Sequence, residues 1–135
     1  MRLWHQSLIP HLPRQQLLGQ HRECCALRGA GWGRKHATVD YVFEYVPEHL
    51  VAYHYLIIDE MKRRGYNPDP IWRNVNWRGK TLQEQEEWCG QALVYEFYYA
   101  ALTGGRLYPE HNDTYLQECL DNLAGKGIII DKEKL

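Results

Sequence analysis

The first 39 residues of this chain contain almost no negative charge, because Glu23 is their only acidic residue. Residues 1–80 carry twelve Lys and Arg against seven Asp and Glu, whereas residues 81–135 carry four against ten. The net charge of −1 therefore hides a basic half, which is the half to consider for binding polyanions. A basic surface for phosphates normally excludes carboxylates, so Glu23 calls for a chemical explanation.

The sequence also lacks the patterns of disulfide-rich and membrane proteins. No CxxC pair occurs among its four cysteines, Cys24, Cys25, Cys89 and Cys119. Adjacent helical cysteines seldom bridge, so we expect reduced thiols in a cytoplasmic protein. No apolar run is long enough for a signal peptide or a membrane span, and no membrane partner is expected.

Familiar metal and catalytic motifs are missing as well. Only His21, Cys24 and Cys25 approach a zinc-ligand cluster, and a helix would aim the two cysteines about 100° apart. We therefore expect no metal and no cofactor. There is no GxSxG, P-loop or Rossmann glycine pattern, and Ser7 and Thr38 do not lie in nucleophile-like turns.

Length and a hydrophobic content of 44% fit one compact all-α domain over residues 1–135, a bundle of about four helices with long irregular loops. Strand alternation is weak, while proline and capping residues mark helix starts and glycines mark ends. The capping-box pattern from Thr81 to Glu84 opens the most apolar segment, which we expect to be the central helix. The helices are expected at residues 14–29, 47–65, 81–104 and 114–127.

Around Glu23, helical spacing predicts small or uncharged neighbours, including Gly19, Gln20 and Ala26. Open space beside a carboxylate is what a substrate pocket on a helix requires. The alternative is a surface ion pair of Glu23 with Arg22 or Arg28.

The loop after the first helix places Trp32 beside Arg34 and Lys35. Aromatic side chains interleaved with basic ones can stack on unpaired bases and hold phosphates. A loop tryptophan can also simply pin the loop to the core. The segment is therefore a candidate nucleic-acid contact.

The N-terminal half resembles the pyrimidine-dimer DNA glycosylase/AP lyase family of phage endonuclease V type. The resemblance rests on an "LLxxxRE" helix that places Arg22 and Glu23 at this distance from the chain start. A basic loop, "KHATVDYVFEYV" and a long helix ending in "MKRRGYN" follow. It covers roughly residues 1–69, and the joint spacing of these segments is its most specific feature.

This resemblance implies an all-α DNA repair endonuclease that acts on double-stranded damaged or abasic DNA, without a cofactor and as a monomer. Such enzymes attack C1′ of the damaged nucleotide with the α-amine of the chain and form a Schiff base. The catalytic candidates here are Met1, or Arg2 after processing, and Glu23. The DNA-binding candidates are Arg22, Arg28, Trp32, Arg34 and Lys35.

Several positions depart from the family pattern. Arg2 is too bulky to favour removal of Met1, so we expect the retained Met1 to present the amine. Ala26 replaces a phosphate-binding arginine, for which Arg28 is the candidate substitute. The C-terminal "GKGIIIDKEKL" lacks the aromatic residues that the phage enzymes use at a pyrimidine dimer. The alternatives are a non-catalytic nucleic-acid-binding module on the same scaffold and a protein-interaction domain.

Overall fold

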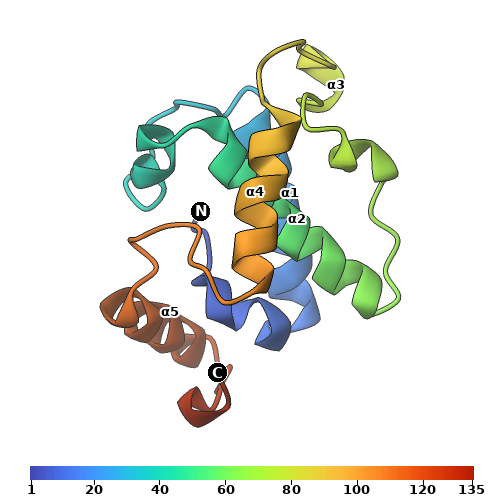
Figure 1. Ribbon diagram of the computed structural model, residues 1–135. Coiled ribbons are helices and arrows are strands. Elements are labelled where there is room, and N and C mark those ends of the chain that lie inside the picture. The colour runs from blue at the N-terminus through green and yellow to red at the C-terminus, as the bar shows by residue number, and fades with distance from the viewer.

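The computed structural model describes residues 1–135 and is entirely helical apart from loops and one isolated bridge between Trp77 and Glu84 (Figure 1). The predicted all-α fold is confirmed. The α-helices are α1 (Arg14–Arg28), α2 (Pro47–Arg63), α3 (Gly79–Leu82), α4 (Gln91–Leu102) and α5 (Asp113–Gly125). Short 3-10 helices are η1 (Gln6–His11), η2 (Asp40–Glu44), η3 (Pro70–Arg73) and η4 (Lys132–Lys134). None of these helices is long and apolar enough to cross a membrane.

A proline and a glycine mark the two ends of helix α1, as the sequence predicts. Pro13 precedes its first residue, where a missing N–H costs no helical hydrogen bond. Gly29 follows its last residue and donates its N–H to the carbonyls of Cys25 and Ala26. A β-carbon at Gly29 would lie 2.9 Å from the carbonyl oxygen of Arg78, so this close approach of two chain segments requires glycine.

Helix α2 is the centre of the molecule and packs against α1, α4 and η1 (Figure 1). It begins with Pro47, and Gly65, with φ of 86°, terminates it. The predicted inward face is confirmed, since all of its members are buried: Leu50, Tyr53, His54, Ile57 and Met61. One cluster of buried hydrophobic residues extends from Leu3 through this helix to Leu123.

The helix expected from Thr81 is wrong in its first half. Helix α3 ends at Leu82, because the next residue, Gln83, has a φ of 58° in the left-handed region, and α4 begins only after Gly90. A left-handed residue cannot continue a right-handed helix. Thr81 lies inside the short α3 and does not cap α4, whose N-cap is Gly90. Helix α4 buries only Val94 and Tyr98. The prediction that it is the central helix is therefore wrong, and α2 has that position.

Helix α5 was predicted correctly. Its cap is Asn112, whose side-chain oxygen accepts a hydrogen bond of 2.9 Å from the N–H of Tyr115. Leu116, Cys119 and Leu123 point inward and are buried. The helix lies beside the start of the chain, to which the Tyr115 hydroxyl donates a hydrogen bond of 2.5 Å at the Leu3 carbonyl.

Candidate active site

A pocket of about 220 Å³ contains the carboxylate of Glu23 and the first residues of the chain. The N-terminal segment, α1, the basic loop and the end of α5 each supply part of its wall. The lining residues are Met1, Arg2, Trp4, Glu23, Thr38, Asn122 and Lys126. The structure thus brings all three catalytic candidates into one pocket.

The first four residues are fixed in place by hydrogen bonds. The Tyr115 hydroxyl binds the Leu3 carbonyl, and the Tyr53 hydroxyl donates to the Trp4 carbonyl at 2.6 Å. Residues 3 and 4 are buried between α2 and α5 as a result. Met1 remains 44% exposed, so residue 1 is accessible to solvent while residues 3 and 4 are held in place.

The side chain and the main chain of Arg2 have different neighbours. Its guanidinium lies over the rings of Trp4 and Tyr115, at 5.9 and 5.8 Å from their centroids. Its main-chain N–H favours the ionised form of Glu23 and so acts to lower the pKa of that carboxyl. The main chain of residue 2 therefore influences the candidate acid, while its side chain packs on the two aromatic rings.

The environment of Glu23 suits proton transfer. Burial raises the pKa of its carboxyl, while the Arg2 N–H, the α-amine, Lys126 and Arg22 oppose that rise. A carboxyl with a raised pKa exchanges protons more readily near neutral pH. The surrounding positive charge also reduces its repulsion of DNA phosphates.

The surface ion pair considered for Glu23 does not form. The ion pairs of the structure join Glu60 to Arg63 and Arg64, and Asp59 to Arg73. A carboxylate without an ion-pair partner, placed in a pocket, is free for chemistry with a ligand.

The basic loop exposes its two charged candidates, Arg34 and Lys35, and Arg22 is exposed on α1. Trp32 is half-buried and meets Trp88 edge to face, with ring centroids 5.8 Å apart. Its indole therefore anchors the loop to the body of the protein. Both charged side chains lie on the solvent side of that anchor.

Arg28 corrects the prediction of a DNA contact, because it is fully buried. Its guanidinium donates to the main-chain carbonyls of Trp72, Asn74 and Trp77 at 2.8, 2.7 and 3.2 Å. It also donates to Nδ1 of His54 at 3.0 Å. A side chain committed to interior acceptors cannot reach a phosphate at the surface. Arg28 instead ties α1 to η3 and the segment that follows it.

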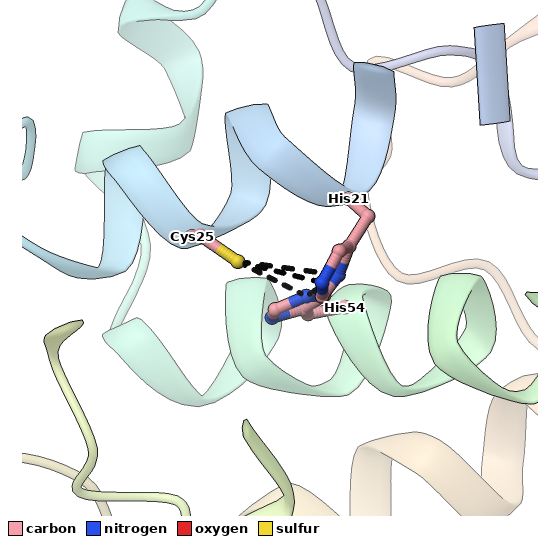
Figure 2. Close-up of side chains that lie close together, drawn as sticks. All are labelled: His21, Cys25 and His54. Atoms are coloured by element: carbon pink, nitrogen blue, oxygen red, sulfur yellow. Dashed lines mark hydrogen bonds between the residues drawn. The ribbon is translucent and has the colours of Figure 1, made fainter. Parts of the chain in front are cut away.

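The spacing of His and Cys residues along the chain did not reveal one cluster of metal-ligand types. His21 and Cys25, one turn apart on α1, meet His54 of α2, and their ligand atoms lie within 4.8 Å of one another (Figure 2). Nδ1 of His21 is 2.8 Å from Nε2 of His54, and the Cys25 sulfur is 3.8 Å from Nε2 of His21. The third residue of the cluster, His54, lies on a different helix, 29 residues after Cys25.

Arg28 decides how this cluster is protonated. A guanidinium can only donate, so Nδ1 of His54 must be the unprotonated nitrogen. Burial and the Arg28 charge hold the pKa of His54 well below its ordinary value, so the ring is neutral and its proton sits on Nε2. That N–H donates to Nδ1 of His21, so Nε2 of His54 has no lone pair free for a metal. Metal-bound histidines normally donate their second nitrogen to an acceptor, the reverse of this arrangement.

A serine–histidine pair also occurs, but it is a helix cap. The hydroxyl of Ser7 is 2.8 Å from Nδ1 of His5, and the Ser7 N–H donates to the same nitrogen. Both bonds close the start of η1. The pair has no buried carboxylate behind it as a hydrolase triad would.

Comparison with known proteins identifies the class that this fold and pocket define. The family described as pyrimidine dimer DNA glycosylase matches residues 1–74, more than half of the chain. The chain belongs to the pyrimidine dimer DNA glycosylase family. No curated protein and no solved structure matches it. The matched segment contains η1, α1, α2 and Glu23 and ends before α4 and α5.

Sequence reasoning missed four of the pocket residues: Trp4, Thr38, Asn122 and Lys126. The last two, at the end of α5, are four positions apart and share a helix face, a signal that was available in the sequence. No local pattern, however, connects that face of α5 to Glu23, which lies 99 positions before Asn122. Lys126 reaches the pocket with its ammonium 5.4 Å from the centroid of the Trp4 ring.

Proposed function

We propose that this protein cleaves damaged or abasic double-stranded DNA as a DNA glycosylase and/or abasic-site lyase. The observation that carries the proposal is the shared pocket of Met1, Arg2 and Glu23. Membership of the pyrimidine dimer DNA glycosylase family supports the substrate class. The exposed charges of Arg22, Arg34 and Lys35 provide the phosphate contacts.

In the proposed reaction, the α-amine attacks C1′ of a nucleotide that has been rotated out of the duplex. The bond from C1′ to the base breaks, and the base leaves with the electron pair and takes up a proton. Opening of the sugar ring gives an imine, and removal of a proton from C2′ expels the 3′ phosphate by β-elimination. Glu23 stabilises the positive charge at C1′ and transfers the protons. Water then hydrolyses the imine and releases the enzyme.

An α-amine suits this role because its ordinary pKa is about 7.7–8.0, against about 10.4 for a lysine. A useful fraction is therefore unprotonated at neutral pH. We assign the nucleophile to Met1, whose removal ahead of Arg2 is disfavoured by the bulk of the arginine. If Met1 is removed, the amine becomes the nitrogen of Arg2, whose N–H already favours the ionised Glu23 carboxylate.

Borohydride trapping on an abasic-site duplex tests the proposal. Reduction of the imine should yield a stable protein–DNA cross-link, and peptide mapping should locate it at residue 1. Intact-mass measurement of the same sample establishes whether Met1 is retained. An N-terminal extension that blocks the amine should abolish the cross-link.

The other outcomes are equally informative. A cross-link on Lys126 or Lys35 would keep the lyase and reject the α-amine as nucleophile. No cross-link, together with intact DNA, would reject catalysis and favour the non-catalytic binding module.

Salt dependence separates nucleic-acid binding from a protein-interaction role. The logarithm of the affinity for duplex DNA should fall with the logarithm of the salt concentration, with a slope of about −0.9 per phosphate contact. Replacing Arg34 and Lys35 together by alanine should flatten that slope. An affinity that does not depend on salt would contradict every nucleic-acid function.

A further inference from the structure

One buried amide connects the chain start to Glu23. The side chain of Gln20 is 1% exposed and lies on α1 one turn before Glu23. Its Nε2 donates to Oε2 of Glu23 at 3.0 Å and to the Arg2 carbonyl at 2.9 Å. Its Oε1 accepts from the Trp4 N–H at 2.7 Å and lies 3.0 Å from the Tyr53 hydroxyl.

The chemistry of these partners fixes the orientation of the amide. A carboxylate and a carbonyl can only accept, so they require the NH₂ end of Gln20. The Trp4 N–H can only donate, so it requires the oxygen end. Both hydrogens and the oxygen are used, and a flipped amide would lose all three bonds. Neither glutamate nor an apolar residue could satisfy this set.

We propose that Gln20 is a positioning residue that sets the distance and orientation between the chain-terminal amine and the Glu23 carboxylate. This inference rests on the proposed lyase function. Gln20 binds the main chain on both sides of residue 3, at Arg2 and Trp4, so the backbone that carries the amine cannot move independently of α1. The third bond selects one rotamer of Glu23, because it holds Oε2 on the side of the N-terminal segment.

The bond to Glu23 also affects its protonation. A donated N–H stabilises the ionised carboxylate and counteracts burial, which raises the pKa of Glu23. Loss of the bond should move that pKa further upward. Gln20 therefore links the geometry of the amine to the proton affinity of the acid, and this link can be measured in the free protein.

The test substitutes Gln20→Met, which keeps the length of the side chain and removes its hydrogen bonds. On an abasic-site duplex, kcat should fall by about 10- to 100-fold, the scale of a misplacement of roughly 1 Å, while KM changes little. The acid limb of the pH–rate profile should move to higher pH. Carbon-13 NMR titration of Glu23 without DNA should show the same direction.

Two further variants keep the result interpretable. Gln15→Met changes an exposed glutamine of the same helix and should leave kcat, the pH profile and the Glu23 titration unchanged. Gln20→Glu retains the volume and acceptor atoms, so it covers the case in which Gln20→Met does not fold. It places a second carboxyl 3.0 Å from Glu23 and should make the pair titrate in two separated steps.

The inference would be overturned if a folded Gln20 variant kept the wild-type kcat and the wild-type Glu23 titration. A loss of thermal stability without either change would show that Gln20 is only structural. If wild-type protein neither cleaves nor cross-links abasic DNA, the proposed function fails. The NMR titration then decides separately whether Gln20 controls Glu23.

Discussion

At the scale of the residue, the pocket gives Glu23 what a catalytic carboxyl needs. The Arg2 N–H, the α-amine and Lys126 all stabilise the ionised form of Glu23. The positive groups among them also offset its negative charge, which makes a carboxylate compatible with a DNA-binding surface. None of them forms an ion pair with it, so the carboxylate remains available. In the proposed reaction, the positive charge around Glu23 serves both the acid and the phosphates of the bound DNA.

Replacing Glu23 by glutamine should separate binding from chemistry. We expect turnover on an abasic-site duplex to fall by about 100- to 10,000-fold, the contribution of a positioned acid or base. Binding should be retained or tightened because a negative charge is removed. Single-turnover kinetics and binding titrations measure the two effects. The control Glu118→Gln changes an exposed carboxylate of α5 and should leave both unaltered; wild-type turnover in Glu23→Gln would exclude Glu23 from catalysis.

At the scale of the element, α1 has two faces with different tasks. One face carries Glu23 to the pocket and the buried Gln20 that binds it, while the other carries Arg28 into the interior. The buried guanidinium donates to carbonyls of η3 and of the segment after it, and Arg78 returns two hydrogen bonds to the carbonyls of Arg28 and Gly29. The end of α1 is thereby held against the segment around residue 75.

Substitution of Arg28 should therefore affect stability before it affects DNA binding. In Arg28→Met, three partly buried main-chain carbonyls lose their donor, and the free energy of unfolding should fall by about 3 kcal/mol or more. Urea unfolding measures this change. Arg34→Met in the exposed loop should change stability by less than about 0.5 kcal/mol and weaken DNA binding instead. A stable Arg28→Met protein with weakened DNA binding would restore Arg28 as a DNA contact.

At the scale of the whole molecule, the interior contains several neutral histidines. Burial lowers the pKa of His5, His21, His49, His54 and His111, in the case of His111 to about 3. Nδ1 of His111 accepts from the Gln6 N–H, and Nε2 is 2.8 Å from the Tyr41 hydroxyl. His111 thereby connects the N-terminal segment to the part of the chain that precedes α5.

The protein should consequently lose stability in mild acid. Below the unfolded pKa of about 6.5, unfolded histidines bind protons that the folded ones exclude, so the free energy of unfolding falls as pH decreases toward the folded values. For His111 alone the loss at pH 5 is about 2 kcal/mol. Urea unfolding at pH 7.5 and pH 5 measures it. His111→Gln should reduce the difference between the two pH values, whereas exposed His11→Gln should not; equal differences in all three proteins would contradict this origin.

Local chemistry determined much of the fold. Pro13, Pro47, Gly29 and Gly65 bracket α1 and α2, and the spacing of apolar residues on α2 identifies its buried face. These signals act over one helical turn, so they can be interpreted from neighbouring residues alone. The absence of other acids among the first 39 residues likewise singles out Glu23 by charge alone, without knowledge of its neighbours in space.

Only the tertiary structure decided the rest. The sequence could not show that Arg28 is buried, since its carbonyl acceptors lie more than 40 residues away. Nor could it place Lys126 beside Glu23, or show that Gln83 would take a left-handed conformation and interrupt the third helix. Helix signals are local, whereas the burial of a charge and the wall of a pocket depend on long-range packing. For this chain, the sequence determined the helices that carry the site, and packing decided which side chains face it.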